Sequence, residues 1–310
     1  MKRSNVLCAA LIFVAACKDA PTAAAPAPEP MRFSAWSAPV WMGASVNSTS
    51  AEFHPAISDD GLTFFFASNR PGGAGRMDLW YAERPSRDSG WSAPKNFGTL
   101  NTAGGEFSPM LAPDRHSLFF ATDGRGNASG DIYVTNRDRV NDNTGWQEPV
   151  SLGSSVNSLF DDEDPTVFAD PASSTLTLYF TSLNRPDGPG DYDLYTSSRG
   201  GDGKWTPATL VAELSTPARE THPTIRRDGL EMIFVSDRAG GVGSLDLWVS
   251  TRATTKDKWS TPQNLSAINT TVEDRGPSLS SDGQTLYFAS NRPGGIGATD
   301  FWMCTRTRLP

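Results

Sequence analysis

Cysteine is scarce in this sequence, which has only 3 in 310 residues. A disulfide-stapled scaffold is therefore excluded, and a hydrophobic core must hold the fold. Basic residues are also in the minority, since 27 Lys and Arg face 35 Asp and Glu, a formal net charge of −8. Nucleic-acid binders use an excess of Lys and Arg to replace condensed counterions, so we expect no nucleic-acid partner.

Motifs of well-known chemistry are missing as well. The sequence contains no nucleophile elbow, no phosphate-binding loop, no dinucleotide fingerprint and no zinc motif of short spacing. Because these motifs are missing, enzyme activity is uncertain, and a protein that is not an enzyme is the favoured interpretation. It predicts no catalytic residue, no cofactor and no bound metal.

The sequence also has no hydrophobic run long enough to span a bilayer. Its longest apolar run is short and lies at the N-terminus. The basic start MKRSN precedes VLCAALIFVAA at 6–16, a run too short to span a bilayer and typical of an export signal. The tetrapeptide VAAC at 14–17 resembles the lipobox of bacterial lipoproteins, which implies removal of residues 1–16 and acylation of Cys17. The alternative is an ordinary signal peptide in which Cys17 is incidental.

The residues after the lipobox suggest where the protein resides. Lys18 replaces the aspartate that marks inner-membrane retention in enterobacteria, which favours an outer-membrane lipoprotein facing the periplasm or the cell surface. Residues 17–33 are rich in Ala and Pro without periodicity, so we expect a tether. With Cys8 removed and Cys17 lipidated, Cys304 would be the single cysteine of the folded part, unable to form an intramolecular disulfide.

Residues 34–310 consist of five repeats. A Trp followed by Pro two or three residues later starts each unit, roughly every 55 residues, at Trp36, Trp91, Trp146, Trp205 and Trp259. Each unit holds four segments of strand character between turn signals, among them Asp-Gly pairs at 60–61, 228–229 and 282–283. Four-stranded units repeated radially predict an all-β, five-bladed β-propeller with four antiparallel strands per blade.

The order of the segments also predicts how the ring closes. The repeat region begins with a Trp-led strand at 36–43 and ends with a strand at 300–306. The fifth unit therefore lacks a fourth strand of its own. We expect the N-terminal strand to complete the last blade, in a 1+3 closure.

Charged residues occupy fixed positions in every unit, on what we call the top face, formed by the loops that correspond to 47–52 and 70–78. An acid precedes the innermost strand at Glu52, Glu106, Asp162, Glu220 and Asp274. An Arg and then an Asp flank a Gly-rich loop at Arg70 and Asp78, Arg125 and Asp131, Arg185 and Asp193, Arg238 and Asp246, and Arg292 and Asp300. A role shared by all five blades favours structural ion clusters. The alternative is a ring of carboxylates at the channel mouth that binds a cation or a basic partner.

Deviations from the repeat are better indicators of a binding site. The residue before the repeat Pro varies between units and is expected to line the channel: His54, Ser108, Asp164, His222 and Gly276. His54, Asp164 and His222 could ligate a metal in a narrow channel, but their spacing does not support it, which favours a solvated lining. The acidic run 161–164 could likewise hold Ca²⁺, although a solvated loop is the favoured alternative.

The fifth unit shows a family resemblance most fully. It resembles the TolB-type, WD-repeat-like propeller repeat in Pro277, Ser280, Asp282, Gly283, Leu286, Tyr287, Phe288, Ser290, Arg292, Gly294, Gly295 and Asp300. The second unit departs from this pattern with Arg115 after Asp114, and the third has four extra residues after Asp170. No counterpart of the N-terminal α/β domain of TolB is found in this sequence, so the role of TolB is not implied.

Together these features predict an envelope-anchored binding or scaffold lipoprotein. Its partner would be an envelope protein or a glycan, contacted through the top face, and its oligomeric state is left open. The alternative is a carbohydrate-active enzyme, hydrolase-like or lyase-like, that uses carboxylates at the central channel. An enzyme of this kind requires a deep central pocket with one unequal pair of carboxyl groups.

Overall fold

The structure is a computed structural model that describes residues 31–126, 129–170, 173 and 175–310. The chain divides into Met1–Pro30 and Met31–Pro310. The predicted signal peptide, Cys17 and most of the predicted tether lie outside the described residues. Among the residues described, no helix is both long enough and apolar enough to cross a membrane.

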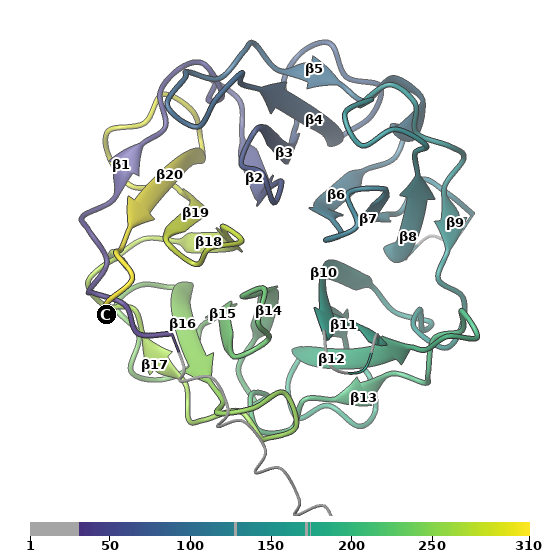
Figure 1. The fold of residues 1–310 in the computed structure, drawn as a ribbon, viewed down its shortest axis with the longest axis vertical. Coiled ribbons are helices and arrows are strands. Elements are labelled where there is room, and N and C mark those ends of the chain that lie inside the picture. Colours follow the sequence, from purple (N-terminus) through teal and green to yellow (C-terminus); the bar gives the residue numbers. More distant parts are fainter. Residues whose placement is uncertain (1–30, 127–128, 171–172, 174) are drawn as a thin grey trace, which may run out of the picture. The chain divides into compact units, whose positions relative to one another are not determined.

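Met31–Pro310 forms five four-stranded antiparallel sheets around a central axis (Figure 1). The innermost strands are β2 (Glu52–Ile57), β6 (Glu106–Leu111), β10 (Asp162–Asp170), β14 (Glu220–Ile225) and β18 (Asp274–Leu279). The second strands are β3 (Thr63–Ser68), β7 (Ser117–Thr122), β11 (Thr175–Leu183), β15 (Glu231–Ser236) and β19 (Thr285–Ser290). The third strands are β4 (Asp78–Glu83), β8 (Asp131–Asn136), β12 (Tyr192–Arg199), β16 (Asp246–Thr251) and β20 (Asp300–Thr305). The outermost strands are β5 (Lys95–Asn96), β9 (Val150–Ser151), β13 (Thr209–Leu210), β17 (Gln263–Asn264) and β1 (Val40–Trp41), and a 3-10 turn, η1 (Gly98–Leu100), precedes β6. The predicted five-bladed propeller is confirmed.

Strand β1 closes the ring by pairing with β20 in the last blade (Figure 1). Trp41 lies opposite Trp302 in this pair, and an isolated bridge joins Phe33 to Arg308. The Arg306 guanidinium stacks 4.3 Å from the ring centre of Trp36, a cation–π contact. The expected 1+3 closure is therefore confirmed.

The hydrophobic core lies between the blades. Five separate clusters of buried side chains each combine residues of two neighbouring blades. The last aromatic residue of each second-strand run is fully buried: Phe66, Phe120, Phe180, Phe234 and Phe288. Since each blade buries apolar side chains against both neighbours, the ring is stable only when it is complete.

Cys304 belongs to the cluster between the fourth and fifth blades and is 1% exposed. Burial raises the pKa of its thiol to about 12. Because the thiolate is the nucleophile, we expect iodoacetamide to leave Cys304 unmodified in the folded chain and to alkylate it rapidly in urea. Peptide mapping by mass spectrometry measures this difference, and rapid alkylation of Cys304 without denaturant would contradict it.

Candidate functional site

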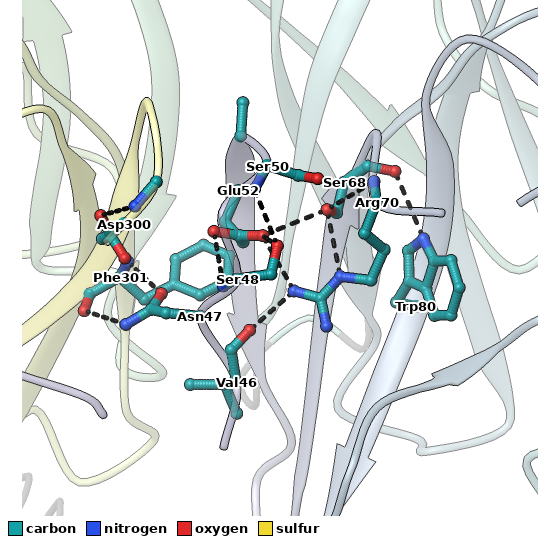
Figure 2. A network of polar contacts seen from close by, with 12 residues as sticks. Val46, Asn47, Ser48, Ser50, Glu52, Ser68, Arg70, Trp80, Asp300 and Phe301 are labelled. Carbon is teal, nitrogen blue, oxygen red and sulfur yellow. Dashed lines mark hydrogen bonds and ion pairs between the residues drawn. The ribbon is translucent and has the colours of Figure 1, made fainter. Parts of the chain in front are cut away.

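The acids of the repeat are buried inside their own blades. Figure 2 shows the network around one of them, Glu52. Glu52 accepts hydrogen bonds from the Ser48 backbone N–H at 3.2 Å, the Ser68 hydroxyl at 3.3 Å and the Arg70 guanidinium at 3.0 Å. Arg70 also donates to the Val46 carbonyl at 2.7 Å. This network joins the loop before β2 to the end of β3, so it braces the blade.

Three further blades repeat this ion pair, and one does not. Asp162 pairs with Arg185, Glu220 with Arg238, and Asp274 with Arg292. In the second blade, Glu106 accepts from the hydroxyls of Thr102 and Thr122, while Arg125 pairs with Glu148. The ring of carboxylates considered at the channel mouth is not formed, because all five acids are 0% exposed: Glu52, Glu106, Asp162, Glu220 and Asp274.

The Asp that begins each third strand holds the Gly-rich loop. Asp78 accepts from the backbone N–H groups of Ala74 and Gly75 at 3.0 and 3.2 Å. A Cβ at Gly73 would lie 1.6 Å from the Asp78 carboxylate, so glycine is required there. Asp300 binds its loop through the N–H groups of Ile296 and Gly297. These aspartates therefore have a structural role.

The acidic run 161–164 does not converge on a single point. Asp161 accepts from the Gly130 N–H at 2.7 Å, and Asp162 is fully buried against Arg185. Asp164 lies on the channel axis. The run therefore does not form the Ca²⁺ site that was one alternative for it.

The residues before the repeat Pro meet on the channel axis, and we call this group the hub: His54, Ser108, Asp164, His222 and Gly276. All five have positive φ, between 50° and 58°. The register shifts at the same point in every innermost strand, which marks a β-bulge. The hub lines a cavity of about 40 Å³.

Two histidines and an aspartate dominate the hub. The imidazoles of His54 and His222 stack with ring centres 4.8 Å apart and planes 17° apart. Their Nε2 atoms lie 3.9 and 3.4 Å from Asp164 Oδ1. Asp164 also accepts from the hydroxyls of Ser108 at 2.5 Å and Thr181 at 2.9 Å. The first and fourth blades are not neighbours in the ring, yet the channel is narrow enough for their side chains to touch.

Burial controls the charges of the hub. It lowers the pKa of His54 to about 3, with repulsion from His222 adding to the effect, and it also lowers the pKa of His222. Burial opposes ionisation of Asp164, but both histidines and the hydroxyl donors hold the pKa of its carboxyl below the usual value. At neutral pH the hub therefore holds two neutral imidazoles and one carboxylate.

The next residue in the chain behaves in the opposite way. Burial, with repulsion from Asp164 and other acids nearby, raises the pKa of Glu163 to about 8. Glu163 and Asp164 are thus an unequal pair of carboxyl groups, as the enzyme alternative requires. The cavity at Asp164 is nevertheless about 40 Å³, whereas pockets for small molecules measure about 300–1,000 Å³.

A second cavity, which we call the lower funnel, opens the channel at the face opposite the top face. It has a volume of about 350 Å³, and the apolar side chains of Met110, Phe168 and Leu279 contribute to its wall. Its lining also includes Asp59 and Arg227, whose charged groups pair at 3.0 Å across the first and fourth blades. Burial raises the pKa of Asp59, although Arg227 opposes this shift. The hub and the lower funnel are continuous, because three residues line both: Met110, Thr224 and Ser278.

The lower funnel was not predicted from the sequence, and it lies at the other end of the channel from the face predicted to bind. A signal was present one residue before the repeat Asp. That position changes chemistry from blade to blade: Asp59, Pro113, Ala169, Arg227 and Ser281. Variation at a fixed position of a repeat is the same sign that identified the hub.

No model of a known protein family matches the sequence, and no curated protein matches it either. Solved structures share the fold. An α-L-arabinofuranosidase from Lactobacillus brevis is 13% identical over 83% of this chain and 90% of that chain, with a TM-score of 0.57. A thermostable family-43 glycoside hydrolase is 11% identical over 86% and 92%, with a TM-score of 0.57. An α-L-arabinofuranosidase from Podospora anserina, in complex with cellotriose, is 13% identical over 88% and 96%, with a TM-score of 0.55.

TolB from Acinetobacter baumannii also matches, with a TM-score of 0.44 and 14% identity over 79% of this chain and 53% of that chain. Identities this low concern the fold alone. The chain is thus a five-bladed propeller similar in structure to glycoside hydrolases. The TolB-type character of its repeat stays a prediction.

Proposed function

We propose that this propeller binds a short glycan in the lower funnel. The observation that carries the proposal is the cavity of about 350 Å³ on the channel axis. Its volume lies within the range of about 300–1,000 Å³ that small-molecule sites occupy. The hub, at about 40 Å³, is too small for a sugar ring.

The lining of the lower funnel suits a sugar. Apolar side chains such as Met110, Phe168 and Leu279 offer a surface for the C–H face of a sugar ring. The carboxylate of Asp59 and the guanidinium of Arg227 offer charge-assisted hydrogen bonds to hydroxyl groups. The solved propellers of similar fold add support, because two are arabinofuranosidases and one of these is in complex with cellotriose.

The cellular setting of this proposal comes from the sequence. We propose an outer-membrane lipoprotein, anchored through acyl chains on Cys17, whose propeller faces the periplasm or the cell surface. The motif VAAC at 14–17 supports the anchor. The net charge of −8 supports an envelope glycan or protein as partner in place of a nucleic acid.

The second candidate function is glycoside hydrolysis in the same cavity. Asp59 and Asp170 both line the lower funnel, and two carboxyl groups are what most glycoside hydrolases use. Burial raises the pKa of Asp59, which suits a general acid. The similarity in fold to family-43 and related hydrolases favours this candidate.

Replacement of Arg227 is expected to weaken glycan binding at least about ten-fold, a loss typical of a charge-assisted contact. Calorimetry of the purified full-length chain with cello- and arabino-oligosaccharides measures the effect of Arg227→Ala. Arg76→Ala is the matched control, because Arg76 forms an exposed ion pair with Asp123 on the top face. Binding that Arg227→Ala leaves unchanged, or no binding by the wild-type chain, would count against the lower funnel.

The same oligosaccharides separate binding from hydrolysis. Release of reducing sugar by the wild-type chain, lost in Asp59→Asn and Asp170→Asn, would establish the hydrolase. Binding without turnover supports a binding module, which is the outcome we expect. Thermal melts of both variants show whether either substitution acts through the fold.

A further inference from the structure

The hub contains a cluster of metal-ligand types that glycan binding does not use. His54, Asp164 and His222 come from three different blades, and their candidate ligand atoms all lie within 4.8 Å of one another. We infer that the hub binds one divalent transition-metal ion of the zinc, cobalt or nickel type through these three side chains. None of these three residues lines the lower funnel, although the two cavities adjoin.

The distances between the ligand atoms fit such an ion. A tetrahedral zinc ion with bonds of about 2.0–2.2 Å separates its ligand atoms by roughly 3.4 Å. Asp164 Oδ1 lies 3.4 Å from His222 Nε2 and 3.9 Å from His54 Nε2. The ligand atoms of the two histidines lie within 4.8 Å of each other. The His54 imidazole therefore has to move by up to roughly 1.4 Å to complete the three-ligand set.

The ligand types decide which ion fits. Imidazole nitrogen favours zinc, cobalt, nickel and copper, whereas calcium and magnesium prefer a shell made of oxygen. The cavity of about 40 Å³ also exceeds the roughly 10–15 Å³ that one water molecule needs. An ion held by three side chains therefore has room for a water molecule as a further ligand.

Residues around the cluster already orient two of its three ligands, whereas the buried Nδ1 of His54 has no hydrogen-bond partner among the described residues. The hydroxyls of Ser108 and Thr181 and the backbone N–H of His222 hold the Asp164 carboxylate. The Thr221 hydroxyl lies 2.8 Å from His222 Nδ1. A proton on Nδ1 in this hydrogen bond leaves the Nε2 lone pair free, the arrangement that histidine ligands of metals usually have.

The backbone at the hub supports a functional role for the three side chains. The fold requires a left-handed residue at this position in every blade, and glycine adopts that conformation without strain, as Gly276 does. His54, Asp164 and His222 occupy the same conformation at φ 53°, 55° and 51°, and so does Ser108 at φ 50°, which donates to Asp164, although all four carry a Cβ. Strain that persists at one cluster points to a role beyond folding.

A hydrogen-bonded plug that only fills the channel is the competing explanation, and zinc binding distinguishes the two. The purified full-length chain, stripped with EDTA, is titrated with ZnCl₂ by calorimetry and by thermal melting. We expect one ion per chain and a higher melting temperature, since binding to the folded state alone stabilises it. Cobalt in place of zinc should give visible d–d absorption.

The variants are chosen so that the fold survives. His54→Gly and His222→Gly suit the left-handed backbone, and each should reduce zinc affinity at least about ten-fold. Asp164→Asn, which keeps the shape of the side chain, should do the same. His116→Ala is the matched control, because His116 is the third histidine of the chain and lies exposed in a turn.

Three outcomes would overturn the inference. The first is a wild-type chain that binds no zinc and shows no change in melting temperature. The second is zinc affinity that His54→Gly, His222→Gly and Asp164→Asn leave equal to that of wild type. The third is stabilisation by Ca²⁺ or Mg²⁺ but not by zinc, cobalt or nickel.

Discussion

A chain without residues 31–45 is expected to lose cooperative folding. This deletion removes β1, the partner of β20, and also removes Trp36 and Trp41 from the cluster between the fourth and fifth blades. Both Trp side chains are partly buried, so each loss costs less than the about 3–5 kcal/mol of a fully buried aromatic side chain, and the lost strand pair adds to it. A domain of this kind is stable by about 5–15 kcal/mol in total. Circular dichroism during heating measures the effect, and we expect no cooperative transition.

A circular permutant provides the control for this deletion. The Leu309 N–H donates to the Arg32 carbonyl at 2.8 Å, so a short linker can join Pro310 to Met31. A chain that starts at Val46 and carries residues 31–45 after this linker keeps every strand pair. It should melt cooperatively, close to wild type. A deletion variant that melts like wild type, or a permutant no better than the deletion, would show that strand closure does not hold the ring together.

The second large effect concerns the buried ion pairs on the top face. Glu220→Gln leaves the buried Arg238 guanidinium without its carboxylate partner, which should cost about 3 kcal/mol of unfolding free energy. Glu106 occupies the equivalent position in the second blade, but the described residues give it only hydroxyl and backbone N–H donors as partners. Glu106→Gln should therefore stay within about 1 kcal/mol of wild type.

Urea denaturation of both variants measures this contrast. Glu106 and Glu220 can be compared directly, because burial raises the pKa of both carboxyl groups. They differ in whether an arginine is their partner. Arg238→Met combined with Glu220→Gln removes the unpaired cation and should recover part of the loss. Equal destabilisation by Glu220→Gln and Glu106→Gln would mean that the arginine is not what makes the carboxylate necessary.

The fold could be predicted from the sequence because the same order of strand and turn signals occurs in five units. Trp, Pro, an Asp-containing turn, an aromatic run and a Gly-rich loop recur in one order, so each unit supports the assignment of the others. Closure by β1 followed from counting segments. The residues that form the hub were also predictable, because this fixed position of the repeat varies between blades.

The environment of the repeat acids could not be predicted in the same way. Glu52 and His54 are two residues apart, and simple alternation in a strand places both side chains on one face. The β-bulge between Phe53 and Ala56, with His54 at φ 53°, breaks that alternation. His54 consequently reaches the axis while Glu52 packs into its own blade. No sequence motif that we identified predicts this bulge.

Contacts across the channel could not be predicted from the sequence either. His54 meets His222, and Asp59 meets Arg227, in both cases between the first and fourth blades. Blades that are not neighbours in the ring touch only where the innermost strands converge, so these contacts depend on the channel diameter. A repeat pattern gives the number of blades but does not give the distance between opposite side chains.

The hub also separates the chemistry of the axis from the stability of the ring. Each blade places one residue of the hub there, while the apolar clusters that stabilise the ring lie elsewhere, between neighbouring blades. A propeller of this design can exchange one ligand for another through substitutions at five positions that lie outside the apolar clusters between the blades. The five hub residues can therefore vary almost independently of selection for folding. A library restricted to those five positions would sample new binding chemistry on an unchanged scaffold.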